Sequence, residues 1–342
     1  MSFFTVLLQI LDWESFDVFN VAVATGGCPL NPVCRHLLKV LGLTQRLRLQ
    51  LSRLDAFLRA VEEHYLLQPY HNSTHAADVV QALGSMITSD AWTNALEDWE
   101  LLALLIAAAV HDVGHPGVNN DFHMRIDSPE AKLYGSVGSI NERHHAALAV
   151  KLLECPENDF FSDSLGPERS EAFKDLIRDL ILHTDMKYHT KMVEAFNRVV
   201  NTLGSNLEAW PPYERREALQ MLLHCADISN PARPLHQCTE WGKRVQEELY
   251  IQGDKERVLG LSVTKLCDRY MSAPADAQTG FIQRIMKPCM QALRPIAPKF
   301  VSLVEPHIAQ SLKYWETCLH KEDDKGLSAE DETQLLFSYL AP

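Results

Sequence analysis

Three short segments of the sequence combine histidine and aspartate in a way that suits a bound metal ion. In the segment YHNSTHAADV, His71 and His75 lie four residues apart, which on a helix places both imidazoles on one face. In the segment HDVGHPG, the imidazole of His111 adjoins the carboxylate of Asp112. In the segment LHCADISNP, Asp227 follows a run of apolar residues. Because each segment borders an apolar stretch, we expect these polar groups to meet inside the protein, where they need partners.

Two imidazoles and two carboxylates suit a single ion, namely those of His75, His111, Asp112 and Asp227. A mixed nitrogen and oxygen site of this kind binds Zn²⁺ or another divalent ion and leaves positions open for water. A second ion could share Asp112 and would rely on water for its other ligands, as is typical of Mg²⁺ or Mn²⁺. The residue types therefore allow a site with two divalent ions.

Taken one at a time, the same residues have simpler interpretations. A His–Asp dipeptide is common, and His71 and His75 could both lie on the surface. His224 is better explained as a core histidine or as a neighbour of a ligand, and Asp78 as a structural contact between helices. Only the co-occurrence of three such segments, each beside an apolar helix, favours metal binding.

Helical periodicity runs through nearly the whole chain, and convincing strand alternation is absent. Residues 99–110 (WELLALLIAAAV) are apolar on all sides, which predicts a helix buried in the middle of the domain. Further helices are predicted over residues 33–66 with a break near Gly42, 171–182, 213–226 after two prolines, and 239–251 with Gly253 as C-cap. The pattern therefore predicts an all-α fold.

We expect one catalytic domain over residues 1–342, with N-terminal helices to about residue 65, a core over about 65–285 and C-terminal helices beyond. Residues 1–13 are apolar but too short to span a bilayer, and we interpret them as a docking helix or the edge of a longer protein. Residues 320–331 (HKEDDKGLSAED) predict a solvated loop before a last short helix. Breaks are expected at residues 26–32, 155–167, 204–212 and 272–278.

The composition, with 46% hydrophobic and 23% charged residues, is that of an ordinary globular protein. The formal net charge of −13 argues against nucleic acid as a partner, because a phosphate polymer would be repelled. A small anion stays compatible with this charge where local cations dominate a site. The eight cysteines include no CxxC pair and no run reaches transmembrane length, so we expect reduced thiols and a cytoplasmic location. The oligomeric state is left open.

The three segments resemble the signature of the class I cyclic nucleotide phosphodiesterases, within the wider HD-type metallohydrolases. The family pattern YHN-x-x-H-A-x-D-V, then HD-x-x-HPG, then A-D-x-S-N-P is similar to this sequence almost letter for letter. The resemblance extends to NERHH at residues 141–145, LHTDM at 182–186 and AQTGFI at 277–282. It covers roughly residues 65 to 285 in conserved order, and cAMP-acting members are the most similar in pattern.

The resemblance implies a role for each matching residue. The tighter ion, usually zinc, would be held by His75, His111, Asp112 and Asp227, and Asp112 would also touch a second ion, usually magnesium. The waters of that second ion would be held by His115, Glu142 and Thr184. His71 would be the general acid. The substrate pocket would be formed by Tyr70, Met186, Asn230, Val245, Gln278 and Phe281.

The implied reaction is hydrolysis of a 3′,5′-cyclic nucleotide to the 5′-monophosphate, with cAMP as substrate and cGMP as a further candidate. A hydroxide bridging the two ions would attack phosphorus, while an imidazolium protonates the departing 3′ oxygen. Gln278 would bond the purine edge, Phe281 and Val245 would cover its faces, and the segment at residues 155–167 could alter the pocket rim.

Three other functions are compatible with parts of the pattern. An HD-type phosphohydrolase acting on a linear nucleotide would share the metal ligands without needing His71, Gln278 and Phe281 as a set. A non-catalytic sensor of cyclic nucleotides is disfavoured by the intact set of ligands and general acid. A helical scaffold with a metal staple would not require an open coordination position.

Overall fold

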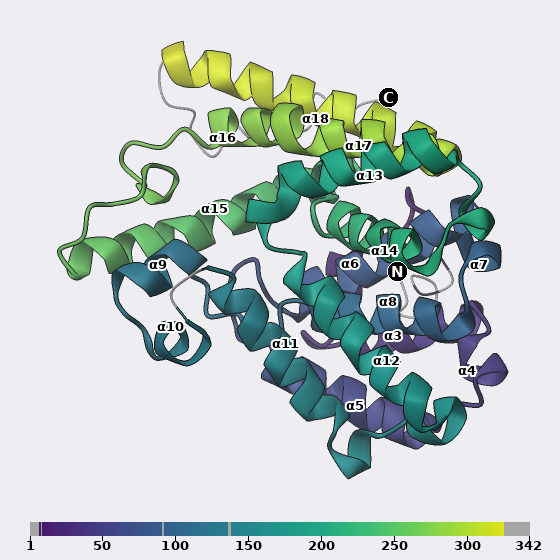
Figure 1. Ribbon diagram of the computed structural model, residues 1–342. Helices are drawn as coiled ribbons and strands as arrows, with labels where there is room; N and C mark the ends of the chain where they lie inside the picture. The colour runs from purple at the N-terminus through teal and green to yellow at the C-terminus, as the bar shows by residue number, and fades with distance from the viewer. Residues whose placement is uncertain (1–6, 8, 91, 136–137, 325–342) are drawn as a thin grey trace.

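The computed structural model describes residues 7, 9–90, 92–135 and 138–324, which form helices joined by loops and short 3₁₀ turns (Figure 1). Within these ranges there is no β-strand, so the predicted all-α fold is confirmed. The helices are α2 (Val18–Ala24), α3 (Leu30–Val40), α4 (Leu43–Arg46), α5 (Leu51–His64), α6 (Ser73–Ser89), α7 (Trp92–Ala95), α8 (Asp98–Val110), α9 (Asn120–Arg125), α10 (Pro129–Tyr134), α11 (Ile140–Leu153), α12 (Ser162–Leu182), α13 (His189–Leu203), α14 (Pro212–Asp227), α15 (Leu235–Val258), α16 (Pro274–Phe281), α17 (Lys287–Leu293) and α18 (Pro298–Asp324).

Short 3₁₀ and π segments link several of these helices: η1 (Pro156–Asn158), η2 (Met186–Tyr188), η3 (Leu207–Ala209), η4 (Asn230–Ala232), η5 (Lys265–Cys267) and the π segment η6 (Ile282–Met286). In Figure 1, α5, α11 and α12 form one side of the molecule, while α16, α17 and α18 stack on the opposite side. The helices α6, α8 and α14 lie between these two groups.

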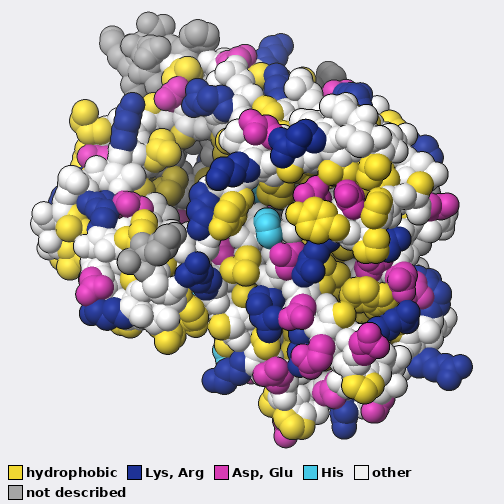
Figure 2. Space-filling view, viewed as in Figure 1, with side chains coloured by type: hydrophobic (Ala, Val, Ile, Leu, Met, Phe, Trp, Pro, Cys, Tyr) yellow, Lys and Arg dark blue, Asp and Glu magenta, His cyan; other side chains and the backbone are white. Residues whose placement is uncertain are grey.

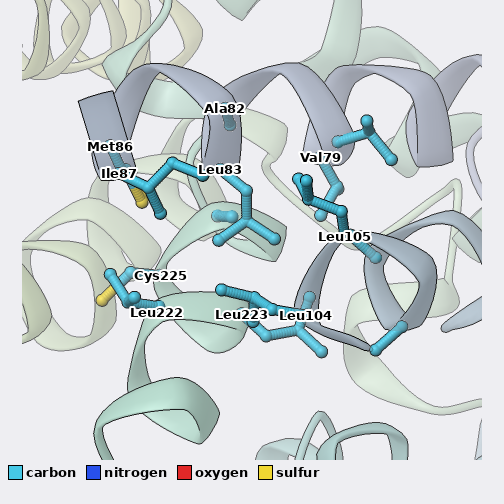
Figure 3. Packing of buried hydrophobic residues seen from close by; sticks show 14 of the residues in the cluster. Val79, Ala82, Leu83, Met86, Ile87, Leu104, Leu105, Leu222, Leu223 and Cys225 are labelled. Carbon is cyan, nitrogen blue, oxygen red and sulfur yellow. The ribbon is translucent and has the colours of Figure 1, made fainter. Parts of the chain in front are cut away.

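The helix α8 is the most deeply buried element, as its all-round apolar sequence predicts. Every residue from Leu101 to Val110 is inaccessible to solvent, and a capping box between Glu97 and Glu100 fixes the start of the helix. Figure 3 shows Leu104 and Leu105 of α8 packed among leucines of α6 and α14. This apolar packing fixes the positions of the helix ends where the polar segments begin.

Several predicted boundaries are confirmed and others are wrong. The chain breaks at Gly42, which adopts a left-handed φ of 71° between α3 and α4, and α14 begins at Pro212. Helix α15 does not end at Gly253 but continues to Val258. A Cβ at position 253 would lie 1.9 Å from the backbone oxygen of Cys267, so the glycine allows a close approach rather than a cap.

One further prediction needs correction. Helix α18 continues through residues 320–324, where a loop is predicted, and the predicted last short helix lies outside the described residues.

The break predicted at residues 155–167 is confirmed. It contains η1, which lies between α11 and α12, and the non-helical Gly166 interrupts the start of α12. Within it, Phe160 and Phe161 are buried beside Phe57 and Phe173 and anchor the segment to the core.

The N-terminal residues in view also pack on the domain. Trp13 is buried and its indole N–H donates to the backbone oxygen of Ala232 at 2.8 Å, while the greater part of the predicted docking helix lies outside the described residues. On the face drawn in Figure 2, basic and acidic side chains are interspersed. Across the described ranges, no helix combines the length and apolar character needed to cross a membrane.

Candidate active site

The first histidine segment forms the start of α6, with Asn72 as its N-cap. The Asn72 side chain accepts hydrogen bonds from the backbone N–H groups of Thr74 and His75 at 2.9 and 3.2 Å. His75 therefore lies in the first turn of the helix and is fully buried. His71 precedes the helix, so the prediction that both histidines share a helical face is wrong. Their rings nevertheless lie close together, with centroids 6.0 Å apart.

Three helix ends meet at one buried point. His75 lies in the first turn of α6, His111 and Asp112 directly follow α8, and Asp227 is the last residue of α14. Asp227 Oδ1 lies 3.0 Å from His75 Nε2 and 3.2 Å from His111 Nε2, and Asp112 Oδ2 lies 3.1 Å from His111 Nε2. One potential ligand atom from each of the four residues lies within 4.8 Å of the others. We call these four residues the aspartate–histidine cluster.

The chemistry of this cluster fits a divalent cation. His111 Nδ1 lies 2.9 Å from the backbone oxygen of Ala108, which can only accept, so Nδ1 carries a proton. Its Nε2 faces the oxygens of Asp112 and Asp227, so positive charge, from a proton or from a metal ion, is needed among them. Burial disfavours a charged ring, but the two carboxylates outweigh it and raise the pKa of His111 well above its ordinary value. A divalent ion would satisfy all four groups.

The pKa values of the two aspartates shift in the opposite direction. Burial favours their neutral forms, yet His111 outweighs burial and lowers the pKa of Asp112 and of Asp227 below the ordinary carboxyl range. Both are therefore ionised at neutral pH and available as ligands. His145 faces the same site, with Nε2 3.8 Å from Asp112 Oδ1 and Nδ1 donating to the backbone oxygen of Val113 at 2.9 Å.

His71 is held by Glu248, an acid of α15 that the sequence analysis missed. Glu248 Oε1 bonds His71 Nδ1, and its Oε2 accepts the backbone N–H groups of His71 and Tyr70 at 3.0 and 2.9 Å. Burial lowers the pKa of His71, but Glu248, with Asp112, outweighs burial and raises it to about 9. The ring is therefore an imidazolium at neutral pH, and its Nε2–H is not used by Glu248.

A signal for Glu248 exists in the sequence. Trp241, Val245 and Glu248 are spaced by four and three residues, so one face of a helix carries an aromatic, an aliphatic and an acidic side chain. An acid on an otherwise apolar helical face needs a buried partner. That partner is His71, and Glu248 itself is only 5% exposed.

A polar network fixes Tyr70 and Asn230 beside the cluster. The Tyr70 hydroxyl donates to Asn230 Oδ1, and Asn230 Nδ2 donates to Asp78 Oδ2 at 3.2 Å. Asp78 pairs in turn with the buried guanidinium of Arg233 at 2.7 Å, which confirms its predicted structural role between helices. The amide of Asn230 is therefore oriented from both ends.

Two of the three predicted neighbours of the second ion, His115 and Glu142, lie near the cluster. The His115 ring stacks on His71 with centroids 3.9 Å apart, and its Nδ1 accepts from the backbone N–H of Gly117. Both oxygens of Glu142 accept from Asn120 Nδ2, at 3.3 and 3.0 Å. Burial and then nearby Asp185 raise the pKa of Glu142 to about 7.

The residue Thr184, just after α12, is buried and donates its hydroxyl to the backbone oxygen of Ile181 at 2.8 Å. This bond leaves the hydroxyl oxygen with lone-pair capacity for a water molecule. Burial and the neighbouring imidazolium of His71 lower the pKa of His115 well below its ordinary value, so this ring is neutral. Because Nδ1 of this neutral ring accepts from Gly117, its Nε2 carries the proton. His115 and Glu142 therefore add no positive charge beside Asp112.

One cavity of about 310 Å³ joins the cluster to an apolar pocket. Its lining includes all six predicted substrate residues, Tyr70, Met186, Asn230, Val245, Gln278 and Phe281, together with His71 and Asp227. The prediction missed Trp241 and Leu249, which also line it. Residues 155–167 are absent from the described lining, so the prediction that they shape the pocket rim is wrong. Gln278 and Phe281 project from α16, and Val245 from α15.

The sequence matches the family described as 3′5′-cyclic nucleotide phosphodiesterase over residues 70–307, and the chain belongs to this family. The resemblance of its motifs is thereby confirmed, while the wider HD-type label describes the chain only loosely.

Individual relatives agree with this assignment. The 3′,5′-cyclic-AMP phosphodiesterase 4C of Rattus norvegicus is 36% identical over 279 residues, covering 80% of this chain and 51% of the rat protein. The dual specificity calcium/calmodulin-dependent 3′,5′-cyclic nucleotide phosphodiesterase 1C of Mus musculus is 34% identical over 297 residues, covering 86% of this chain and 41% of the mouse protein. The chain thus spans about half the length of the curated relatives it matches.

A solved structure is similar along nearly the whole chain. The crystal structure of the phosphodiesterase domain of the RhoPDE fusion protein from the choanoflagellate Salpingoeca rosetta superposes with a TM-score of 0.84 at 28% identity. The match covers 92% of this chain and 97% of that one. The described fold is therefore that of a phosphodiesterase domain.

Proposed function

We propose that this chain hydrolyses the 3′,5′-cyclic phosphate of cAMP, and of cGMP as a second substrate, to the 5′-monophosphate. The observation that carries the proposal is one cavity in which Asp227 and His71 lie beside an apolar pocket that also presents the amides of Asn230 and Gln278. A cyclic nucleotide has matching parts, because it joins a charged phosphodiester to a flat purine.

Two divalent ions would complete the site, zinc as the tighter one and magnesium or manganese as the second. When bound, such ions lower the pKa of water and offset negative charge on the phosphoryl group. The aspartate–histidine cluster would hold the tighter ion. The second would lie at Asp112, where Glu142 and Thr184 would accept hydrogen bonds from its waters and His115 would present its Nε2–H to them.

The proposed general acid is His71. Glu248 occupies Nδ1 and stabilises the imidazolium, so Nε2 is the nitrogen that would donate a proton to the departing 3′ oxygen. Protonation matters because an alkoxide is a poor leaving group. His71 is therefore proposed to act at the ester oxygen, while the cluster acts on the opposite side of phosphorus.

The pocket would bind the purine. Phe281 and Val245 offer apolar surface for the two faces of a flat ring, Met186 lines the outer part, and Gln278 supplies one amide for the ring edge. None of the described residues hydrogen-bonds the Gln278 amide, so it can present either its oxygen or its nitrogen. An amide free to turn suits adenine and guanine alike.

The test is an assay of purified protein with cAMP, cGMP and a linear nucleoside monophosphate, each with and without EDTA. We expect turnover of both cyclic nucleotides, none of the linear one, and loss of activity together with a lower Tm after chelation, because the buried ligands lose their shared partner. Turnover of the linear nucleotide alone would favour the HD-type phosphohydrolase. Full activity in metal-free protein would overturn the two-ion proposal.

A further inference from the structure

A second group of metal-ligating side chains lies in the core, and none of its members lines the substrate cavity. It consists of His189 at the start of α13, His224 on α14 and Cys289 on α17, and one potential ligand atom of each lies within 4.8 Å of the others. His224 and Cys289 are fully buried, and His189 is 7% exposed. We call these residues the thiol–histidine cluster.

The distances in this cluster suit a tetrahedral zinc ion. His189 Nδ1 lies 3.0 Å from His224 Nε2 and 3.8 Å from Cys289 Sγ. With Zn–N bonds of about 2.05 Å and a Zn–S bond of about 2.3 Å, ligands around one tetrahedral ion are roughly 3.3 Å (N to N) and 3.6 Å (N to S) apart. The observed separations therefore differ from those of a zinc site by a few tenths of an ångström.

A further thiol lies beside the cluster, and the two rings hydrogen-bond each other. The Cys225 thiol, next to His224 on α14, hydrogen-bonds Cys289, and Figure 3 shows its sulfur turned away from Leu104 and Leu223. His224 Nδ1 is buried and, within the described chain, has no hydrogen-bond partner. Zinc would replace the proton that His189 Nδ1 and His224 Nε2 share in their hydrogen bond.

The three helices that carry the cluster pack against one another pairwise. We propose that His189, His224 and Cys289, with the Cys225 thiol as fourth ligand, bind a structural zinc ion distinct from the catalytic ions. Zinc binding would release the thiol protons to solvent, and the ion would join α17 to α13 and α14. Imidazole and thiolate ligands in a closed core are the combination that zinc prefers in structural sites.

Cobalt distinguishes this site from the catalytic one, because Co²⁺ bound to thiolate gives a near-ultraviolet charge-transfer band and the aspartate–histidine cluster contains no sulfur. The full chain is freed of metal under reducing conditions and titrated with Co²⁺. We expect the band to saturate with one thiolate-bound ion per chain, to vanish in Cys289→Ser and to weaken in Cys225→Ser. It should persist in Asp227→Asn.

A matched control is Cys34→Ser, which alters a buried thiol on α3 far from the cluster in sequence and should keep the full band. Elemental analysis should find one fewer zinc in Cys289→Ser than in the unaltered chain, with helical content checked by circular dichroism. No charge-transfer band in the unaltered protein at excess Co²⁺ would overturn the proposal without recourse to any variant. An equal loss of the band in Cys34→Ser and Cys289→Ser would overturn it too.

Discussion

The two sides of the substrate cavity differ in charge. On one side, the aspartate–histidine cluster brings buried ionisable groups together at the ends of α6, α8 and α14. On the other, the pocket wall of Met186, Val245, Gln278 and Phe281 is uncharged, and Met186 is 43% exposed. In the cluster, each group depends on its neighbours for charge compensation, whereas each wall residue contributes its own contact.

This difference predicts unequal tolerance to substitution. Removing one member of a buried charged cluster leaves the other members without a partner, and an unpaired buried charge is strongly destabilising. Truncating a residue of the pocket wall removes apolar area or one hydrogen bond, and the others continue to act. Substitution of any one cluster residue should therefore cause a large loss of activity, because it disables the whole cluster. Substitution of a wall residue should cause a small loss that does not depend on the other wall residues.

The largest effect is expected for Asp227→Ala. Asp227 faces both His75 and His111, so its loss should remove the tighter ion and cost several kcal/mol of transition-state stabilisation, on the order of a thousandfold in kcat. Tm should fall as well. Metal content, kcat with cAMP and thermal unfolding are the measurements.

The matched control is Asp175→Ala, an exposed acid on α12 whose side chain is 61% exposed. It should keep zinc content and activity. Near-normal zinc and turnover in Asp227→Ala would show that the carboxylate is not a ligand and that the cluster is not a shared unit.

His71→Ala should lower kcat by about 10²- to 10⁴-fold while leaving metal content unchanged, because it removes a proton donor and not a ligand. An aryl phosphodiester has a leaving group that needs no proton, so the loss on that substrate should be much smaller. His64→Ala, at an exposed position of α5, serves as control. Equal losses on both substrates would exclude His71 as the general acid.

Glu248→Gln should change the pH profile more than the maximal rate. Burial lowers the pKa of His71, and Glu248 is the largest of the effects that raise it to about 9. Because the donor must be protonated, activity is present below this pH and is lost as pH rises through it. Without the charge of Glu248, that loss should occur at lower pH.

The stability of the fold should depend on pH in the same direction as the activity does. A raised His71 pKa stabilises the folded state fully below the ordinary value near 6.5, and this contribution is lost as pH rises through about 9. The difference in Tm between Glu248→Gln and the unaltered chain should therefore shrink towards alkaline pH. Glu247→Gln, at the adjacent and exposed position, should change neither profile. An alkaline limb that does not move would show that Glu248 leaves the His71 pKa unaffected.

The same contrast between cluster and wall explains what the sequence could predict. His75, His111, Asp112 and Asp227 lie in short motifs beside apolar helices, and those helices could be located from periodicity alone. The structure brings the four together as expected. Their contact with one another follows from burial, since polar groups at the ends of core helices must find partners.

Other features depend on packing that no local pattern contains. Glu248 lies about 180 positions from His71 in the sequence, and only the crossing of α15 past the start of α6 makes it a partner. Gly253 was misassigned because a helix cap and a close backbone approach both select glycine. Residues 155–167 do separate α11 from α12, as their Gly and Pro content predicts, but that content does not reveal that Phe160 and Phe161 anchor the segment to the core.

Among the wall residues, Gln278→Ala should raise the KM for both nucleotides by about tenfold or less, the value of one hydrogen bond of roughly 1 kcal/mol. Its amide makes no bond that would select one orientation, so its loss should affect cAMP and cGMP alike. Gln283→Ala, on the exposed surface beyond α16, is the control and should leave both KM values unchanged. A rise in KM for only one nucleotide would show that the Gln278 amide is fixed.

The last prediction concerns the choice between the two nucleotides, which we assign to Asn230. Its amide is held by Tyr70 and Asp78, so it cannot turn freely as Gln278 can. A fixed amide near the purine edge favours adenine by about 1 to 2 kcal/mol, and cAMP should show the lower KM with cGMP still hydrolysed. Tyr70→Phe removes the hydroxyl that holds Asn230 Oδ1, so it should reduce the difference in KM between cAMP and cGMP. Tyr270→Phe, at an exposed position, should leave that difference unchanged. Competition between the two substrates measures the gap directly, and a tenfold preference for cGMP would reverse this assignment of the pocket.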